Sequence, residues 1–298
     1  MALGRPQVAH SLSGQHGDPD DTCRGAQNAS FVRSRPFSGT RPDCYAKPMS
    51  HLHRFFQPEL RPESGTELFL PEDEAHHALS VARLRDGEQV AVFAGRGTEA
   101  TGPIFRQGKR QARVLIEQLR REAPPDAHVI LAPAWLQKEK PLEEIVRRGT
   151  ELGVSRFAFW RAQRSQRPVA AHDKWHRLAV ESCKQSGRLH LPQFDFFEDL
   201  PSAMSSFDGC VLVADILTVT SDLPLPPSAL KSCALIIGPE GDFTDGEREA
   251  LRAGRAIPVS LGRQVLRTEA ASVAMATLVL GALGELGTRL SLSGEAES

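Results

Sequence analysis

Two glycine-containing loops between Leu235 and Leu280 carry residues suited to binding a ligand. Gly238-Pro239-Glu240-Gly241 follows an apolar run at 234–237, and a loop at 262–268, which begins with Gly262, follows a second short run at 257–261. Glycine permits backbone conformations and close approaches that a side chain would block. Both loops can therefore present backbone donors and acceptors to a ligand, and the pattern predicts a small-molecule pocket.

Nucleotide-binding signatures give a first test of this pocket. The patterns GxxxxGK[ST] and GxGxxG both fail in the block, because neither a lysine nor a third glycine stands at the required position. The sequence therefore argues against a nucleoside triphosphate or NAD as the ligand.

A helix is expected after each loop. Thr244 and Glu247 form a capping-box pattern that starts a helix through Leu251, which Gly254 can end. The second helix begins at Glu269 and is rich in alanine and serine, so we expect it to pack closely in the core.

Strands and helices alternate ahead of this block. Such alternation predicts a mainly parallel sheet with helices on both faces, and ligands on such sheets bind at the carboxyl ends of the strands, where the two loops fall. Connecting loops are expected at 199–205 and 219–229. The expected elements are 128–132, 142–152, 156–160, 174–186 and 209–216.

The whole chain is expected to comprise an extension, a small barrel, a linker, the α/β domain just described and a tail. Residues 1–49 lack an apolar period and are predicted to be a disordered extension, with translation beginning at Met49. Residues 50–122 should form a small β-barrel, with strands at 66–70, 89–93, 98–105 and 112–116 and one helix at 72–84. Pro124-Pro125 marks a linker. The α/β domain should then span 126–287, followed by a flexible tail at 288–298.

Composition is typical of a globular protein, with 40% hydrophobic and 24% charged residues. No apolar run approaches the roughly 20 residues that cross a bilayer. Five cysteines without a CxxC pair argue against a disulfide framework and a zinc site, so we expect no metal and a reducing, cytoplasmic environment.

Positive charge is concentrated in one segment, although the chain has a net charge of −1. Residues 156–188 contain eight arginines and lysines against Asp173 and Glu181, an excess of six positive charges. Such a segment can bind an RNA backbone or can be an ordinary solvated helix face. The charge pattern alone does not decide between the two.

The motifs Gly238-Pro239-Glu240-Gly241 and Leu266-Arg267-Thr268-Glu269 resemble those of the RsmE family of SPOUT RNA methyltransferases. Segments 150–154, 163–165 and 185–188 resemble the upstream motifs of that family, in the same order. The resemblance implies a trefoil-knotted SPOUT domain, an exception to the rule against threaded chains, preceded by a PUA-like barrel. It also implies S-adenosylmethionine as cofactor and methylation of a uridine N3 in 16S ribosomal RNA, either free or in the assembled small subunit, by a homodimer.

The resemblance also implies site residues. Backbone and apolar groups of the two loops should hold the cofactor: Gly238, Pro239, Glu240, Gly241, Leu261, Gly262, Leu266 and Thr268. The expected RNA-binding residues are Arg54, Arg83, Arg85, Arg164 and Arg188, with Arg96 and Lys109 as further basic residues of the barrel.

Methylating N3 of uridine requires alignment of donor and acceptor and stabilisation of the base as it loses its proton. Arg267 and Arg164 are the candidate cations, and Glu240 or Glu269 is the candidate proton acceptor. Glu269 can equally be a helix cap, because a carboxylate in the first turn interacts favourably with the helix dipole. Arg267 can equally anchor the loop through a salt bridge.

Three positions depart from the family pattern: Gln163, Asp242 and Ala270. Asp242 and Ala270 leave open a non-catalytic ribosome-assembly factor that binds RNA without transferring a methyl group. A SPOUT methyltransferase that acts on another RNA also stays open, because the sequence specifies the methyl-donor pocket better than the acceptor.

Overall fold

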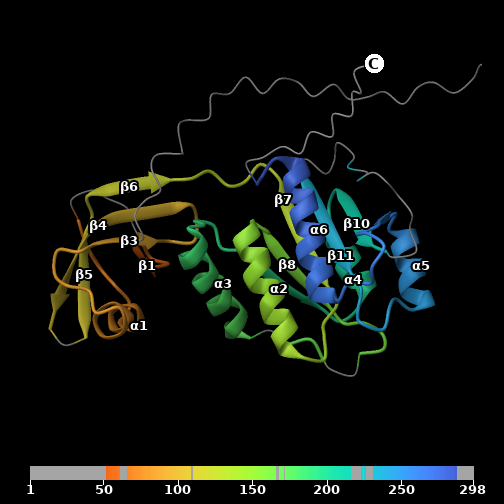
Figure 1. Ribbon diagram of the computed structural model, residues 1–298, viewed down its shortest axis with the longest axis horizontal. Coiled ribbons are helices and arrows are strands. Elements are labelled where there is room, and N and C mark those ends of the chain that lie inside the picture. Colours follow the sequence, from red (N-terminus) through yellow and green to blue (C-terminus); the bar gives the residue numbers. More distant parts are fainter. Residues whose placement is uncertain are drawn as a thin grey trace, which may run out of the picture. The chain divides into compact units, whose positions relative to one another are not determined.

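The computed structural model describes residues 52–60, 66–108, 110–165, 168–170, 172–215, 223, 225 and 231–286. Within these ranges the chain forms two sheets, one in the amino-terminal part and one in the carboxyl-terminal part (Figure 1). The predicted extension at 1–49, the tail at 288–298 and Lys109 lie outside the described residues.

The first sheet has six strands in the order β1-β3-β4-β5-β2, with β6 paired to β4. Strand β1 runs parallel to β3 and the other pairs are antiparallel. Phe55, Val90, Val92, Ile104 and Val114 form its core. The strands are β1 (His53–Phe56), β2 (Glu67–Phe69), β3 (Gln89–Phe93), β4 (Thr98–Gln107), β5 (Gln111–Leu115) and β6 (Gln118–Arg121).

The helix predicted at 72–84 is confirmed as far as Val81, although its geometry changes from α to π, and the prediction is wrong for its last residues. The α-helix α1 spans only Glu72–His76, and a π-helical turn follows at His77–Val81. Arg83 then adopts a left-handed conformation with φ 55°. A left-handed residue cannot continue a helix. The sequence also failed to indicate β1 and β6, which are only four residues long each.

The second sheet is parallel throughout, in the order β12-β10-β11-β7-β8-β9. This confirms the predicted parallel α/β architecture; the trefoil knot stays a prediction. The strands are β7 (His128–Pro133), β8 (Arg156–Trp160), β9 (Gln193–Phe197), β10 (Cys210–Ala214), β11 (Ser232–Ile237) and β12 (Ile257–Val259).

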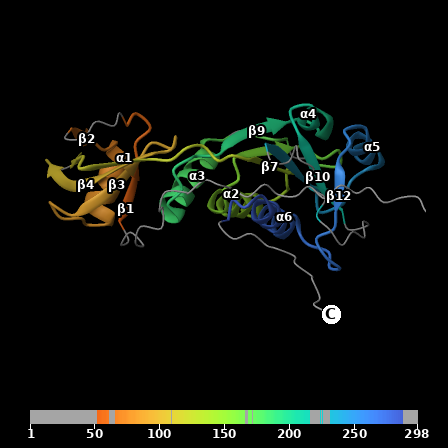
Figure 2. The ribbon, with the colours of Figure 1, turned by 90° about the horizontal axis from the view of Figure 1, so that it is seen from above.

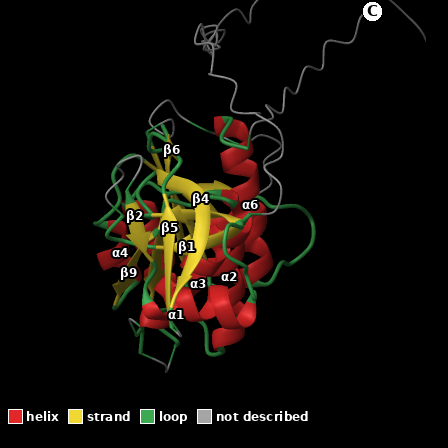
Figure 3. Ribbon diagram, turned by 90° about the vertical axis from the view of Figure 1, so that its left-hand side faces the viewer, coloured by secondary structure: helices red, strands yellow, loops and turns green. Residues whose placement is uncertain are grey.

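Helices cover both faces of this sheet, because side chains alternate between the faces along each strand. On β7, Val129 and Leu131 join the core under α2 (Glu139–Leu152), α3 (Asp173–Ser186) and α6 (Thr268–Leu283). Ile130 and Ala132 join the core under α4 (Leu200–Met204) and α5 (Asp245–Ala253). Figures 2 and 3 show α2 and α6 on one side of the strands and α4 on the other.

Two details of this domain correct the sequence prediction. Strand β9 was not predicted, and 199–205 is not a loop but contains helix α4. Asp199 caps this helix, since its Oδ1 accepts a hydrogen bond of 2.8 Å from the Ser202 amide, and Pro201 lies in the first turn. Asp, Ser and Pro are common in loops, but the same residue types also mark the start of a helix.

No helix among the described ranges is both long and apolar enough to span a bilayer. In the same ranges, no three His, Cys, Asp or Glu residues are grouped so that they could hold a metal ion.

Candidate active site

A cavity of about 380 Å³ lies at the carboxyl ends of β10, β11 and β12. Its size is in the range of small-molecule pockets. Three segments line it, one after each strand: Ala214, Asp215, Ile237, Gly238, Pro239, Glu240, Asp242, Phe243, Leu261, Gly262, Gln264, Val265, Leu266, Arg267, Thr268 and Ala271.

The structure brings most of the predicted residues together in this cavity. Seven of the eight predicted cofactor residues line it, the exception being Gly241. Arg267 and Glu240 also line it, whereas Arg164 and Glu269 do not. The two loops that the sequence indicated therefore share one pocket, while two of the four predicted catalytic residues lie outside its lining.

Gly238 is explained by packing inside the protein. A Cβ added at Gly238 would lie 2.9 Å from the Phe243 ring, which stacks on Trp160 at an interplanar angle of 5°. The Gly238 carbonyl accepts a hydrogen bond of 3.0 Å from the Thr268 hydroxyl. Gly238 and Thr268 thereby tie the loop after β11 to the start of α6.

Asp242 stands in a left-handed conformation with φ 61°. Asp tolerates this conformation better than most residues because its short side chain bonds to nearby groups. Its Oδ1 accepts from the Phe243 amide at 2.7 Å and its Oδ2 accepts from Arg248 Nη2 at 2.7 Å. The departure from the family pattern at this position is thus accommodated by two local hydrogen bonds.

Helix α5 supports one side of the site through its capping box. Thr244 Oγ1 accepts from the Glu247 amide at 3.2 Å, and Glu247 Oε2 accepts from the Thr244 amide at 2.7 Å, which confirms the predicted cap. The other oxygen of Glu247, which is 6% exposed, accepts from the Gln163 amide at 2.8 Å. This carboxylate therefore fixes the segment after β8 against α5.

Asp215 is a functional candidate that the sequence did not reveal. It follows β10, lines the cavity, and donates its amide to the Val259 carbonyl at 3.0 Å. Its Oδ1 lies 3.9 Å from Arg248 Nη1. No local motif marks Asp215; only the parallel pairing of β10 with β11 and β12 brings it to the site.

The two candidate cations occupy different positions. Arg267 is the exposed N-cap residue of α6 on the wall of the cavity. Arg164 Nη1 donates to the Gly241 carbonyl at 3.1 Å and so holds the outside of the loop after β11. Glu269 lies half-buried in the first turn of α6, where a carboxylate favours the helix dipole.

The predicted RNA-binding residues differ in their surroundings. Arg83 and Arg85 are exposed, Arg54 pairs with the buried Glu99, and Arg188 Nη1 donates to the Thr150 carbonyl at 3.0 Å. Burial raises the pKa of Glu99, although Arg54 opposes this effect. Arg96, a further basic residue of the barrel, donates to the Pro58 carbonyl at 2.7 Å.

Carboxylates from other segments neutralise part of the positive charge at 156–188. Arg156 Nε lies 2.5 Å from Asp195, Lys174 pairs with Glu139 and Glu143, and Lys184 pairs with Glu74. The local excess of six charges in the sequence therefore overstates the positive potential of this region.

The fit of the cavity to S-adenosylmethionine can be judged from its walls. Ile237, Leu261, Leu266 and Ala271 supply apolar surface, the two loops supply backbone, and Glu240 and Asp215 supply carboxylates. A ligand with an aromatic base, a sugar, an ammonium group and a sulfonium needs this mixture. The donor set fits the cofactor.

Comparison with protein families decides the class. A family model described as an RNA methyltransferase domain matches residues 122–280, and one described as an RNA methyltransferase PUA domain matches residues 70–117. The chain belongs to this RNA methyltransferase family. The first match covers the second sheet, helices α2 to α5 and most of α6, and the second falls within the part of the chain that forms the first sheet.

Named relatives confirm the resemblance to the RsmE family. Ribosomal RNA small subunit methyltransferase E of Bacillus subtilis is 28% identical over 218 residues, which cover 67% of this chain and 84% of the relative. The Aquifex aeolicus protein of the same name is 27% identical over 234 residues, which cover 77% of this chain and 99% of the relative.

Solved structures agree with this assignment. A methyltransferase from Legionella pneumophila, in complex with bound cofactor SAM, gives a TM-score of 0.69 at 28% identity and covers 78% of this chain and 98% of its own. Ribosomal RNA small subunit methyltransferase E from Neisseria gonorrhoeae, bound to S-adenosyl methionine, gives a TM-score of 0.67 at 24% identity, over 77% of this chain and 97% of its own. Both of these proteins bind S-adenosylmethionine, and both share the fold of this chain.

Proposed function

We propose that this RNA methyltransferase methylates N3 of a uridine in 16S ribosomal RNA. The observation that carries the proposal is the cavity at the carboxyl ends of β10 to β12, which is built from the two predicted loops and has Arg267 on its wall. Relatives that cover most of the chain are named ribosomal RNA small subunit methyltransferases, which supports 16S RNA as the substrate.

The roles of the cavity residues follow from their chemistry. Backbone groups at Gly238, Glu240 and Gly262 and the side chains of Leu261 and Leu266 would hold the cofactor. When bound, the cofactor would supply an electrophilic methyl group from its sulfonium to N3 of uracil and would leave as a neutral thioether.

The reaction also removes the proton of uridine N3. In this proposal the Glu240 carboxylate accepts that proton. The Arg267 guanidinium lies beside the uracil carbonyl oxygens and stabilises the negative charge that develops on the base. Arg164 positions the loop that carries Glu240 through its bond to the Gly241 carbonyl, and Glu269 contributes to the start of α6.

The proposal also covers the setting of the reaction. The enzyme acts in the cytoplasm as a homodimer, on 16S ribosomal RNA or on the assembled small subunit. Val265 and Leu278, whose side chains are 82% and 40% exposed, support a homodimer because exposed apolar side chains near the cofactor pocket and on α6 favour burial against a second copy. In this proposal the barrel domain ends at residue 122 and the methyltransferase domain begins at residue 126.

The test is methyl transfer to small ribosomal subunits from cells that lack the gene. Subunits are incubated with the purified protein and S-adenosylmethionine, the RNA is digested, and the nucleosides are identified by mass spectrometry. We expect 3-methyluridine at one site. A different methylated nucleoside would mean another acceptor, and cofactor binding with no methyl transfer to any RNA would contradict the enzymatic role.

A further inference from the structure

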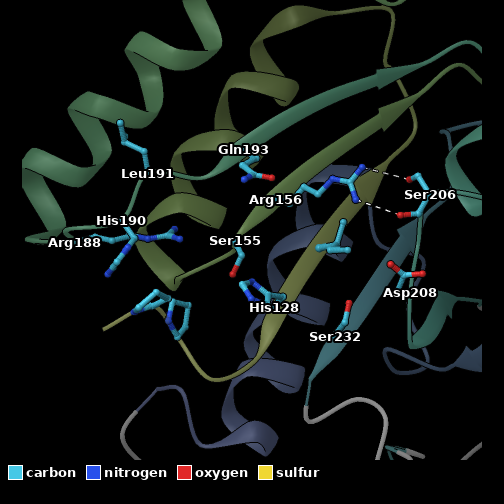
Figure 4. A pocket seen from close by; sticks show the side chains of 13 residues that line it. His128, Ser155, Arg156, Arg188, His190, Leu191, Gln193, Ser206, Asp208 and Ser232 are labelled. Atoms are coloured by element: carbon cyan, nitrogen blue, oxygen red, sulfur yellow. Dashed lines mark hydrogen bonds between the residues drawn. The ribbon is translucent and has the colours of Figure 1, made fainter. Parts of the chain in front are cut away.

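A second cavity, of about 450 Å³, lies at the opposite edge of the same sheet. It is lined at the amino ends of the parallel strands, where β7 starts at His128, β8 at Arg156 and β11 at Ser232 (Figure 4). None of its lining residues lines the cofactor pocket. We call it the basic cavity and define it by His128, Ser155, Arg156, Arg188, His190 and Ser232.

Hydrogen-bond donors dominate the walls of the basic cavity. Two guanidinium groups, two imidazole rings and the hydroxyl groups of three serines line it, whereas Asp208 is the single carboxylate among its lining residues. Guanidinium groups and hydroxyls are the usual partners of phosphate oxygens in proteins. The walls therefore suit an oxyanion better than a neutral or cationic ligand.

Arg188 carries a positive charge that forms no ion pair among the described residues, although the more distant Glu122 attracts it. Its Nη1 donates to the Thr150 carbonyl at 3.0 Å, and none of the carboxylates in the described ranges lies within ion-pair distance of it. Burial lowers the pKa of this guanidinium, although it stays charged. Because a desolvated charge without a counter-ion is costly, an anion in the cavity would stabilise Arg188.

Arg156 is held in a fixed orientation by Asp195, but its hydrogen bonds on the side of the cavity are long. Its Nε donates to Asp195 at 2.5 Å, which fixes the plane of the guanidinium. Its two Nη atoms reach Ser206 at 3.3 and 3.4 Å, longer than the usual distance (Figure 4). A ligand oxygen can replace these long bonds at little cost.

Ser155 adds an unused hydrogen-bonding group. Its hydroxyl is buried and has no hydrogen-bond partner among the described residues. Figure 4 shows this hydroxyl among the side chains that line the cavity. A buried polar group without a partner is uncommon and marks a place where a ligand or ordered water completes the bonding.

We propose that the basic cavity is a second ligand site, separate from the cofactor pocket, which takes a phosphate group carried on a sugar. Its two cations and its hydroxyl groups bind the phosphate and sugar oxygens, and Ile130 and Leu191 supply an apolar wall. The sugar phosphate belongs either to a nucleotide of an RNA strand or to a free small molecule.

The first test is calorimetry with ribose 5-phosphate, inorganic phosphate and ribose. The protein is kept saturated with S-adenosylhomocysteine, so that the cofactor pocket is filled. We expect ribose 5-phosphate to bind more tightly than inorganic phosphate and ribose not to bind. Equal binding of ribose and ribose 5-phosphate, or binding of neither, would overturn the proposal.

Two variants locate the binding. Arg188→Gln removes a cation, and Gln193→Glu places a carboxylate at an exposed position of the cavity wall. Each should weaken ribose 5-phosphate binding about tenfold or more, because a charged hydrogen bond is lost or opposed. Arg177→Gln and Gln185→Glu make the same charge changes on the exposed face of α3 and serve as matched controls.

Each variant is checked for unchanged S-adenosylmethionine affinity, which shows that it is folded and separates this proposal from the proposed function. If Arg188→Gln and Gln193→Glu bind ribose 5-phosphate as well as their controls, the site is wrong. A short single-stranded RNA is then titrated against bound ribose 5-phosphate in the unmodified protein. Displacement assigns the site to an RNA nucleotide, and retention of the ligand assigns it to a free sugar phosphate.

Discussion

At the scale of single residues, Arg267 allows a role in methyl transfer to be distinguished from a role in cofactor binding or folding. It lies exposed on the cavity wall, where it can reach a bound base without supporting the fold. Arg267→Ala should reduce the rate constant of methyl transfer about a hundredfold, as for loss of one transition-state donor, and change cofactor affinity little. Single-turnover kinetics and calorimetry measure the two effects.

Arg263→Ala is the matched control for this prediction. Arg263 is exposed in the same loop but does not line the cavity, so its removal should leave the methyl-transfer rate within about twofold. Equal losses of rate and of cofactor affinity in Arg267→Ala would instead assign Arg267 to cofactor binding.

Asp242 supports a stability prediction. Glycine at this position would remove the strain of the left-handed backbone. Either glycine or alanine would lose the two side-chain hydrogen bonds of Asp242. Asp242→Ala should lower the free energy of unfolding by about 2 kcal/mol, and Asp242→Gly by about 1 kcal/mol less, because alanine adds left-handed strain that glycine avoids. Urea unfolding of both variants measures the difference, and alanine at least as stable as glycine would contradict the prediction.

The residue scale also shows where sequence patterns reach their limit. The motif at 238–241 predicted a pocket, but the need for Gly238 comes from the Phe243 ring, which the pattern did not indicate. Gly238→Val would therefore disturb packing as well as cofactor binding, and it cannot test the pocket alone. Asp215 escaped prediction because the strand pairing that places it in the cavity joins segments distant in the sequence.

At the scale of elements, the capping box of α5 carries a clear prediction. Thr244→Ala removes the side-chain acceptor for the Glu247 amide and should cost about 1 kcal/mol of unfolding free energy. Thr277→Ala, at an exposed position of α6, should change stability by no more than about 0.5 kcal/mol. Urea titrations compare the two variants, and equal effects would mean that the cap does not stabilise the domain.

Elements with strong local signals were predicted well, and weakly patterned ones were not. The strand, loop and helix order from β11 to α6 was confirmed, because glycines and a capping box mark each boundary. Strands β1, β6 and β9 have four or five residues each and stand beside no such marker. Their pairing partners, rather than their own sequences, make them strands.

At the scale of the whole molecule, charge cannot be judged from a linear count. The positive segment at 156–188 meets carboxylates from α1, α2 and β9 once the chain folds. One cation of the segment that stays without an ion pair among the described residues is Arg188 at the basic cavity. Outside the segment, Arg267 lies on the wall of the cofactor pocket. Electrostatic predictions at this scale require the tertiary contacts.

The pair formed by Lys184 of α3 and Glu74 of α1 joins the two domains of the chain. The Nζ and Oε1 atoms are 2.5 Å apart, and the side chains are only 8% and 9% exposed. Burial raises the pKa of Glu74 above its ordinary value of 4.5, although Lys184 opposes this effect. The carboxylate is therefore costly to bury and depends on its partner.

Lys184→Met should accordingly destabilise the protein by about 3 to 5 kcal/mol at pH 7, because it leaves the Glu74 carboxylate buried and unpaired. The loss should shrink as the pH falls through the raised pKa of Glu74 toward 4.5, since the folded protein then holds the carboxyl neutral. Adding Glu74→Gln should restore most of the stability at pH 7. Lys174→Met, which breaks a more exposed pair, should cost at most about 1 kcal/mol. Urea unfolding at pH 7 and pH 5 tests all three variants, and a loss in Lys184→Met that did not depend on pH would show that Glu74 is not its cause.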